Sequence, residues 1–292
     1  MKKVFAEIFA GIIPHKMTRN RWRGILRYGP INAIKLIKKL KREKATSPQF
    51  YLAVCAIAKN EGAYFAEWIE WHKSVGVEKF YIYDNESSDN TREILAPYIK
   101  SGLVEYVYFS GEKRQLPAYD DCLERHRLDT RWIAIIDLDE FIIPIKDKTI
   151  PEFLQRFESF SVVEINWLIY GSGGAKEKEV GAVMERFKYH SQPNHILNRH
   201  IKSIVNPRRV FSVIGCHEVA RISGFAVDSH GERIKKSFWD REPQQDVIRI
   251  NHYAVKSYEE FLEKIGRGKA NTHREYHLDY FERFDLNDMK ED

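Results

Sequence analysis

The chain has 292 residues, with 47 Lys and Arg against 42 Asp and Glu, and a formal net charge of +5. Its 43% hydrophobic and 13% aromatic content excludes a wholly disordered chain. No run approaches the roughly 18–20 apolar residues that a membrane-spanning helix needs. The length indicates one large domain, or one domain with an appendage.

The positive charge is concentrated at the N-terminus. Residues 1–48 contain 13 Lys and Arg and only two acids, so this arm carries a net charge of +11 and the rest of the chain −6. Within the arm, Ile34, Ile37 and Leu40 fall on one side of a predicted amphipathic helix whose other sides are rich in lysine. We expect the arm to bind an anionic membrane surface. The alternative is a helix packed on the body with its basic side in solvent.

Neither nucleic-acid binding nor secretion is indicated. An acidic body would repel a phosphate backbone, and the sequence has no recognition module. Glu7 interrupts the apolar stretch of residues 4–13, which is unlike a secretory signal peptide. The three cysteines, an odd number without a CxxC pair, predict reduced thiols in a cytosolic protein.

Residues 50–145 alternate between strand and helix patterns. We predict strands at 51–58, 79–83, 104–109 and 132–136, separated by helices at 61–75, 88–97 and 119–128. This alternation predicts an open α/β sheet that binds its ligand beyond the carboxyl ends of its strands. The later chain is less regular, with strands predicted at 162–167 and 247–251 and a helix at 258–265. We treat residues 49–292 as one compact unit.

The sharpest chemical signal is a pair of carboxylates, Asp137 and Asp139, after the fourth predicted strand. Carboxylates so placed suit Mg²⁺ or Mn²⁺, hard ions that keep positions open for phosphate oxygens. Polar segments at 58–61 and 84–89 end the first two strands, and parallel strands bring these ends to one edge. The residues therefore predict a nucleotide pocket with a metal ion, with Asp84 as a ligand and Asp89 as a helix cap. The alternative for the D-x-D pattern is a polar turn.

The C-terminal half adds further candidates. His252 follows an apolar strand and is a candidate third metal ligand; a hydrogen-bonded structural histidine is the alternative. Arg199, Lys202, Arg208 and Arg209 form a basic stretch that suits a diphosphate, with a solvated surface as the alternative.

These motifs occur in the order found in a known family. They are Lys59-Asn60-Glu61, Glu67-Trp68-Ile69, Tyr83-Asp84-Asn85, Asp137-Leu138-Asp139-Glu140-Phe141, Trp167 with the glycine-rich residues 171–174, Lys202-Ser203-Ile204-Val205, and Ile250-Asn251-His252-Tyr253 followed by Lys256-Ser257, Glu260-Phe261 and Lys264. Residues 50–266 resemble glycosyltransferase family 92 and its bacterial relatives in the glycosyltransferase family 2 clan. The sequence departs from the pattern at Tyr170, where Phe is usual, and the resemblance does not cover the arm or residues 267–292.

The resemblance implies a fold and an activity. The fold is a GT-A-like open mixed sheet flanked by helices, with a nucleotide-binding half near 50–145 and an acceptor-binding half near 146–292. The activity is an inverting, metal-dependent transfer of a hexose, with UDP-galactose as the expected donor, onto a saccharide or lipid-linked saccharide. Because bacterial relatives build lipopolysaccharide or surface polysaccharide, the expected location is the inner face of the cytoplasmic membrane.

The resemblance also implies roles for individual residues. They are Ala58, Lys59, Asn60, Glu61, Asp84, Arg114, Gln115, Asp137 and Lys202 for the UDP-sugar; Asp137, Asp139 and His252 for Mn²⁺ or Mg²⁺; and Trp167, Gly173 and His217 for the acceptor side. Inverting transfer needs a base that takes a proton from the acceptor hydroxyl. Glu218 is our first candidate for that base, with Asp228 and Asp240 as alternatives.

Two other functions are compatible with the sequence. A sugar-nucleotidyltransferase also combines an α/β sheet with acidic metal ligands, but residues 56–61 lack the glycine-rich basic loop expected of one. The other is a non-catalytic sugar- or membrane-binding module, which has no need for D-x-D beside a nucleotide pocket. A glycosyltransferase releases free UDP, whereas a sugar-nucleotidyltransferase releases pyrophosphate, so the product distinguishes these two enzymes. A binding module would hydrolyse no UDP-sugar.

Overall fold

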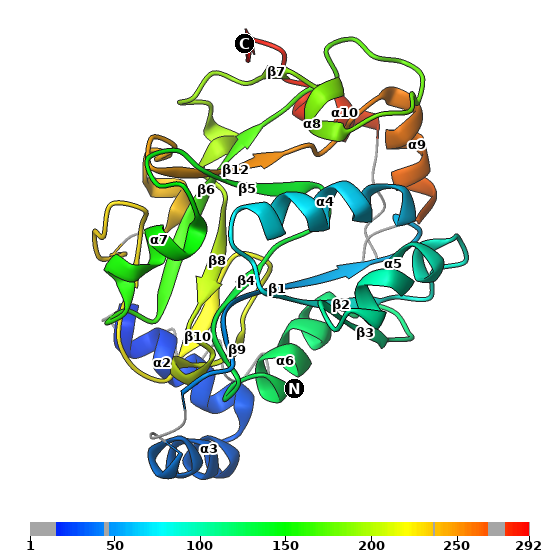
Figure 1. The fold of residues 1–292 in the computed structure, drawn as a ribbon. Coiled ribbons are helices and arrows are strands. Elements are labelled where there is room, and N and C mark those ends of the chain that lie inside the picture. The colour runs from blue at the N-terminus through cyan, green and yellow to red at the C-terminus, as the bar shows by residue number, and fades with distance from the viewer. Residues whose placement is uncertain (1–15, 44–46, 236, 268–277, 292) are drawn as a thin grey trace.

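The computed structural model describes residues 16–43, 47–235, 237–267 and 278–291 (Figure 1). The stretch at residues 4–13, and with it the question of a signal peptide, lies outside them. The helices are α2 (Lys16–Tyr28), α3 (Pro30–Arg42), α4 (Gly62–Ser74), α5 (Thr91–Lys100), α6 (Gln115–Arg125), α7 (Ile150–Leu154), α8 (Val183–Arg186), α9 (Tyr258–Arg267) and α10 (Leu278–Phe284). The strands are β1 (Phe50–Ala58), β2 (Lys79–Asp84), β3 (Val104–Tyr108), β4 (Thr130–Ile135), β5 (Glu140–Pro144), β6 (Val162–Ile169), β7 (Tyr189–His190), β8 (Ile201–Val205), β9 (Val210–Val213), β10 (Val219–Arg221), β11 (Ala226–Val227), β12 (Ile248–His252) and β13 (Met289–Lys290).

One nine-stranded sheet organises the chain. Its strands neighbour each other in the order β3-β2-β1-β4-β8-β6-β12-β5, and β11 pairs with β6. The first four strands of this order are parallel, β8 is antiparallel to both its neighbours, and β5 is antiparallel to β12. The predicted open mixed sheet flanked by helices is therefore confirmed.

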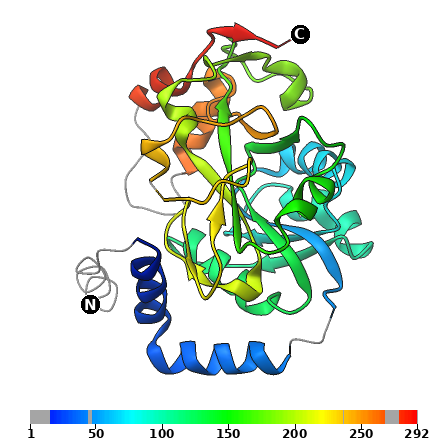
Figure 2. The ribbon, with the colours of Figure 1, turned by 90° about the vertical axis from the view of Figure 1, so that its left-hand side faces the viewer.

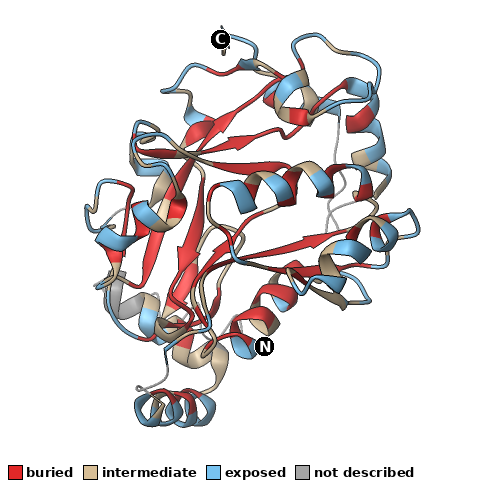
Figure 3. Ribbon diagram, in the orientation of Figure 1, coloured by how far each residue is buried: buried red, intermediate tan, exposed pale blue. Residues whose placement is uncertain are grey.

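Helices cover both faces of the parallel part of the sheet. Along β1, Leu52, Val54 and Ala56 pack in the core that contains the buried side chains of α4. The alternate residues Ala53 and Cys55 pack in a second core with those of α6. Because β1 is buried on both faces (Figure 3), its sequence is a continuous apolar run rather than an alternating one.

Two helix boundaries differ from the prediction. The helix expected to end near Pro97 continues to Lys100 as α5. Pro97 removes one backbone donor, but Tyr98 and Ile99 pack against the core and hold the last turn. The helix expected over 119–128 begins at Gln115 and ends at Arg125, because a proline is tolerated in a first helical turn.

Seven of the observed strands were not predicted, namely β5, β7, β8, β9, β10, β11 and β13. β5 follows the D-x-D segment directly, and β8 is inserted between β4 and β6. The short strand β9 forms a hairpin with β10. β8 is only five residues long and carries Lys202 at a fully buried position, so neither length nor apolar periodicity marks it as a strand.

The N-terminal helices α2 and α3 pack on the body beside the β9–β10 hairpin (Figure 2). Ala33, Leu36 and Leu40 of α3 are buried in a cluster that includes Phe211 and Ala220. The helix therefore has an apolar face that covers the body, as the alternative interpretation proposed. Within the described residues, no helix is both long and apolar enough to cross a membrane.

The predicted apolar face of this helix was partly wrong. Leu40 is buried, but Ile34 is 55% exposed and Ile37 only packs at the margin of the cluster. The face that meets the body is set by Ala33 and Leu36 instead. Ile31 and Ile34 stay in solvent beside the lysines of α3, so a mixed apolar and basic surface remains exposed.

Asp89 joins the starts of two helices. Its Oδ1 accepts hydrogen bonds from the backbone N–H (3.1 Å) and hydroxyl (2.6 Å) of Thr91, and its Oδ2 accepts one from the Gly62 N–H (2.9 Å). A Cβ on Gly62 would lie 2.7 Å from the Asn90 side-chain oxygen, so this close approach requires glycine. The predicted capping role of Asp89 is confirmed, and it serves α4 as well as α5.

We expect Asp89→Ala to lower the free energy of unfolding by about 1–3 kcal/mol, because two helix N-termini lose an acceptor. Burial tends to raise the pKa of Asp89, but the hydrogen bonds from Thr91 and Gly62 outweigh it and lower that pKa. The stabilisation should therefore be present at neutral pH and be lost as the pH falls through the carboxyl pKa. Urea denaturation measures both effects. Glu93→Ala, which removes an acid from the first turn of α5, is the control, and an equal loss in both variants would contradict the capping role.

Candidate active site

The carboxyl ends of the parallel strands meet at one edge, as predicted. Ala58 and Asp84 are paired in register at the ends of β1 and β2, and Asp137 lies two residues beyond the end of β4. β12 brings His252 into register with Glu140 on β5. The D-x-D segment therefore lies between the parallel strands and the end of β12.

Lys202 lies at the centre of this edge. Its Nζ is 2.6 Å from Oδ2 of Asp137 and 3.3 Å from Oε2 of Glu140, and its side chain is 1% exposed. Burial by itself lowers the pKa of Lys202, but the two carboxyl groups outweigh burial and raise it. Burial raises the pKa of Asp137, but the charge of Lys202 reverses the effect and holds that pKa below its ordinary value. Asp137 is therefore an ionised carboxylate.

Glu140 is the third member of this group and behaves differently. Its Oε2 accepts a hydrogen bond of 2.8 Å from the backbone N–H of Asp137, while its buried Oε1 has no partner among the residues that the structure describes. Burial raises the pKa of Glu140 to about 8 although Lys202 opposes the shift. Lys202 therefore pairs chiefly with Asp137.

Asp139 forms an ion pair with a different lysine, Lys264. Lys264 of α9 donates a hydrogen bond of 2.7 Å to Oδ2 of Asp139, and Nε2 of His252 is 3.6 Å from Oδ1. Burial raises the pKa of Asp139, but Lys264 and then His252 outweigh it and place that pKa well below the usual range. Burial lowers the pKa of His252. The pair is therefore an ionised carboxylate facing a neutral imidazole.

Asp137 is fixed by two further donors. Its Oδ1 accepts hydrogen bonds from Nε2 of Gln115 (2.9 Å) and from the hydroxyl of Tyr119 (2.8 Å). The thiol of Cys216 donates to the other end of the Gln115 amide at 3.2 Å. Arg114, the neighbouring candidate, stacks its guanidinium 4.1 Å above the Phe109 ring. The structure thus brings Gln115 to the carboxylates, as predicted, and places Arg114 on the loop beside them.

Polar side chains in the loops that follow the strands form hydrogen bonds with neighbouring loops and strands. Asp84 accepts hydrogen bonds from the Tyr106 hydroxyl (2.5 Å) and from the Ser87 N–H (2.9 Å). Oδ1 of Asn60, a residue with a positive φ of 53°, accepts a hydrogen bond of 2.7 Å from the Ser88 N–H. The bond to Asn60 ties the loop after β1 to the loop after β2, and the bond from Tyr106 ties β3 to the end of β2. Both candidates lie at the predicted edge, and their observed contacts rigidify it.

The neighbours of Asn60 complete this loop. Lys59 is half-buried. Glu61 starts α4, and Arg267 of α9 donates to its Oε1 at 3.2 Å and to the Asn60 carbonyl at the same distance. Burial raises the pKa of Glu61 while Arg267 opposes the shift. α9 therefore closes the first strand-end loop against the D-x-D segment.

The acceptor-side candidates separate into two groups. Trp167 packs against His252, with ring centroids 4.1 Å apart, and against His217 at 5.4 Å, so these two candidates join the site. Gly173 has a φ of +62° and a backbone N–H that donates to Asn287. A Cβ there would lie 2.9 Å from the Tyr189 ring. Gly173 therefore serves the packing of the C-terminal segment.

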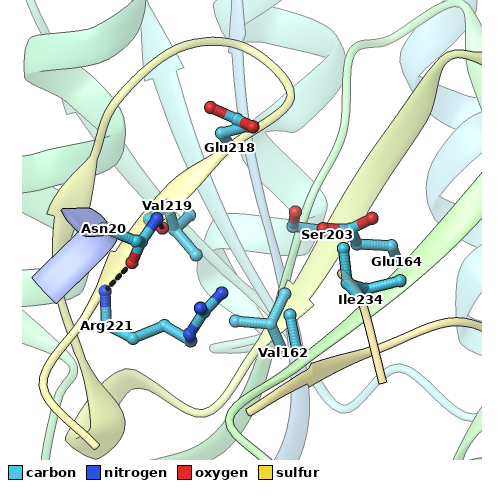
Figure 4. Close-up of a pocket in the computed structure, with 9 residues that line it drawn as sticks. Asn20, Val162, Glu164, Ser203, Glu218, Val219, Arg221 and Ile234 are labelled. Carbon is cyan, nitrogen blue, oxygen red and sulfur yellow. Dashed lines mark hydrogen bonds between the residues drawn. The ribbon is translucent and has the colours of Figure 1, made fainter. Parts of the chain in front are cut away.

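The candidate bases are not brought to the carboxylates. Glu218 lines a small pocket with Ser203 and Arg221 (Figure 4). Ser203 and Lys202 are successive residues of β8 and point to opposite faces of the sheet, so this pocket lies across the sheet from Lys202. Asp228 accepts hydrogen bonds from the backbone of a turn after β11, and Asp240 is exposed. A catalytic role for these residues stays a prediction without geometric support.

The cations beside the carboxylates come from a different segment than predicted. Of the basic stretch, only Lys202 reaches the site; Arg199 pairs with Glu242, Arg208 donates to the Glu43 carbonyl and Arg209 to carbonyls of residues 159 and 160. Lys256, Lys264 and Arg267, all after β12, surround Asp139 and Glu61 instead. Two sequence signals were present: Lys256 and Lys264 belong to the family pattern that follows His252, and the spacing of Lys264 and Arg267 puts them on one face of a helix.

Lys256 is held in an unusual backbone conformation. Its φ is 55°, it is 5% exposed, and its Nζ lies 4.4 Å above the Tyr64 ring. Burial lowers the pKa of Lys256, although Asp139 opposes the shift. A left-handed backbone in a long side-chain residue is costly, and here it directs an ammonium group toward the carboxylates.

Two of the three predicted metal ligands are positioned to share an ion. The 3.6 Å between Asp139 Oδ1 and His252 Nε2 suits two ligands at about 2.1 Å from one metal. Among the described residues, the buried Nδ1 of His252 has no hydrogen-bond partner, and Nε2 is the ring nitrogen that faces Asp139. Asp137 is turned toward Lys202, and the described residues hold no group of three His, Cys, Asp or Glu side chains that could bind a metal alone. The residues therefore fit an ion whose remaining ligands come from a substrate.

Comparison with known proteins connects this geometry to a family. A family model described as Glycosyltransferase family 92 matches residues 49–289. A glycosyltransferase family 92 protein of Ricinus communis is 26% identical over 223 residues, which are 75% of this chain and 38% of that protein. The beta-1,4-galactosyltransferase galt-1 of Caenorhabditis elegans is 27% identical over 248 residues, covering 75% of this chain and 52% of that protein. The chain thus spans about a third to a half of the length of these relatives.

Similarity to solved structures is weaker. A crystal structure of S. aureus TarS 1–349 in complex with UDP aligns with 54% of this chain and 47% of that chain, at 14% identity and a TM-score of 0.36. Such a low score supports no inference about function.

We expect Glu140→Gln to change how stability depends on pH. The pKa of Glu140 is raised to about 8, so folding takes up a proton between about pH 4.5 and pH 8 and the free energy of unfolding falls as the pH rises through that window. The variant lacks this carboxyl. Between pH 5 and pH 8 its free energy of unfolding should therefore fall by roughly 1–3 kcal/mol less than that of the wild type. Urea denaturation at both pH values measures the difference.

The matched control for this prediction is Glu70→Gln. Glu70 is an exposed glutamate whose ion-pair partner within the described residues is Lys73. Identical pH dependence in Glu140→Gln and the wild type would show that Glu140 is ionised in the folded protein.

Proposed function

The chain belongs to glycosyltransferase family 92, and we propose that it is a metal-dependent, inverting hexosyltransferase that uses UDP-galactose. The observation that carries the proposal is the edge cluster, where Asp137 and Asp139 each pair with a lysine and His252 faces Asp139. This combination of paired carboxylates, an imidazole and nearby cations suits a nucleoside diphosphate and a divalent ion.

The choice of donor sugar is supported by a relative. The matching Caenorhabditis elegans protein is named a beta-1,4-galactosyltransferase, and we propose the same sugar for this chain. The acceptor we propose is a saccharide or lipid-linked saccharide, of the kind used in lipopolysaccharide or surface polysaccharide synthesis.

Asp139 and His252 would hold Mn²⁺, or Mg²⁺, with oxygens of the diphosphate as further ligands. When bound, the ion would offset negative charge on the departing diphosphate. Lys256 and Lys264 lie close enough to Asp139 to lower the pKa of its carboxyl group, and Asp139 in turn acts on the pKa of Lys256. The two lysines would therefore add positive charge beside the same phosphates. Because these ammonium groups are in place before the donor binds, they would not have to move during the transfer step.

Asp137 would position the nucleoside rather than the ion. Three donors hold its carboxylate, from Lys202, Gln115 and Tyr119, yet its side chain is 32% exposed. A carboxylate has about four acceptor positions, so one is left for a ribose hydroxyl. Asp84 and Asn60, which brace the neighbouring loops, would shape the floor on which the base lies.

We also propose that the exposed side of α3 binds the inner face of the cytoplasmic membrane. Ile31 and Ile34 are 71% and 55% exposed, and Lys35, Lys38 and Lys41 are exposed on the same helix. Apolar side chains beside several lysines suit an anionic bilayer surface. Such docking would keep the enzyme near a lipid-linked acceptor.

We expect Asp139→Asn and His252→Ala each to weaken Mn²⁺ binding by at least about tenfold. Each change removes one of the two side chains that face each other across the proposed ion site. Isothermal titration of Mn²⁺ into the protein measures binding directly, and Mn²⁺-dependent UDP affinity gives a second readout. Release of UDP from UDP-galactose should fall with both.

The control for these variants is Asp147→Asn, whose carboxylate pairs with Arg156 away from the edge cluster. Wild-type Mn²⁺ affinity in Asp139→Asn would overturn the metal assignment. Release of pyrophosphate from UTP and galactose 1-phosphate, with no release of UDP from UDP-galactose, would instead indicate a nucleotidyltransferase. If the wild type hydrolyses no UDP-sugar, the chain is a binding module.

We expect the triple charge reversal of Lys35, Lys38 and Lys41 to Glu to reduce binding to phosphatidylglycerol vesicles by at least about tenfold, since each lysine near such a surface contributes about 1 kcal/mol. Vesicle co-sedimentation measures the change, and UDP-galactose hydrolysis should stay constant. Reversal of the exposed Lys100, Lys148 and Lys235 is the matched control. Equal vesicle binding by both triple variants would reject the membrane role of α3.

A further inference from the structure

A series of aromatic rings leads from His252 to the protein surface. Trp167 lies 4.1 Å from the His252 ring, His200 stacks on Trp167 at 4.7 Å and 18°, and Trp239 meets His200 edge-on at 4.3 Å. Trp167 is 6% exposed, whereas Trp239 is 40% exposed. Phe238 is half-buried and lies 5.0 Å from Trp239. The series therefore begins at the proposed ion site and ends in solvent.

The segment that carries Trp239 is held firmly on the sheet. Arg199 donates a hydrogen bond of 2.8 Å to the Trp239 carbonyl and pairs with Glu242. Farther along the segment, Nε2 of Gln245 donates to the Trp167 carbonyl at 2.5 Å. Because these bonds hold the backbone at and after Trp239, a ligand would not have to order that part of the segment on binding.

Two histidines give this surface uncharged hydrogen-bonding groups. Nδ1–H of His200 donates to the Leu197 carbonyl at 2.8 Å, and Nδ1–H of His217 donates to the Ile201 carbonyl at 2.7 Å. Burial lowers the pKa of His200 to about 4 and that of His217 to about 3. Both rings are therefore neutral at pH 7, with Nε2 as an acceptor.

We propose that Trp239, Phe238 and His200 form a subsite for a neutral pyranose of the acceptor saccharide. A pyranose offers a face of C–H groups that packs on an aromatic ring and an edge of hydroxyls that donate to imidazole nitrogens. This inference rests on the proposed function, because it assigns the sugar beyond the transferred one to the surface next to the ion site.

The size and charge of the surface favour a saccharide over other ligands. One 40% exposed tryptophan beside a half-buried phenylalanine offers far less than the roughly 800 Å² per partner of a stable protein interface. The guanidinium groups of Arg199 and Arg241, which lie on or beside this segment, are already paired with Glu242 and Glu164, so neither is free to hold a phosphate. Trp167 and His200 connect this surface to His252 by successive ring contacts, so a sugar bound there would lie two rings from the proposed ion ligand.

The test is substitution of Trp239 in the full chain, with a panel of β-1,4-linked galactotetraose, cellotetraose and chitotetraose as probes. Saturation-transfer NMR measures saccharide binding, and UDP-galactose hydrolysis without acceptor measures the donor site. We expect Trp239→Ala to weaken binding of the preferred tetrasaccharide about tenfold and to raise its KM, while Trp239→Phe retains most of it. Donor hydrolysis and UDP affinity should not change.

Trp22→Ala is the matched control, because Trp22 is similarly exposed at 45% but lies on α2. If the wild type neither binds UDP nor hydrolyses UDP-galactose, the proposed function fails. If it does both, and Trp239→Ala binds the tetrasaccharides like the wild type, the subsite is overturned. Failure of the UDP-binding wild type to bind any tetrasaccharide also overturns it.

Discussion

The arrangement of this protein depends on one buried ammonium group. Lys202 is 1% exposed and lies between Asp137 and Glu140, and an unpaired charge at that depth would destabilise the fold strongly. It arrives on β8, the antiparallel strand between β4 and β6. The pairing therefore ties the nucleotide-side strands to the later half of the sheet at the point where the carboxylates emerge.

That pairing has an electrostatic consequence for the site. With a lysine against each aspartate, the pKa values of Asp137 and Asp139 are held low, so the site is ionised before any ligand arrives. Glu140, which shares Lys202 with Asp137, is the group whose pKa rises. A cation entering near Asp139 would compete with Lys264, and the displaced ammonium group would remain close enough to meet a diphosphate.

The sequence predicted the parts of the fold and site that depend on local pattern. The parallel strands, the capping by Asp89 and the edge position of Asp137 follow from periodicity and from where polar residues interrupt it. Lys264 and Asp139 are 125 positions apart in the sequence, so no local spacing pattern predicts their contact. Long-range contacts also decide which face of α3 is buried. Leu36 rather than Ile34 faces the body because Phe211 and Ala220 lie there.

The β9–β10 hairpin connects the arm with the acceptor side. One end of it, at Phe211 and Ala220, packs under α3, while His217 at its turn packs against Trp167. Deleting residues 1–48 would therefore expose apolar surface on the hairpin and disturb His217, so loss of activity in such a truncation would not distinguish a membrane tether from a structural brace. Charge reversal on the exposed side of α3 leaves Ala33, Leu36 and Leu40 in place. The reversal would change any attraction to a bilayer without disturbing the hairpin, and for that reason it separates the proposed membrane role of the arm from its structural role.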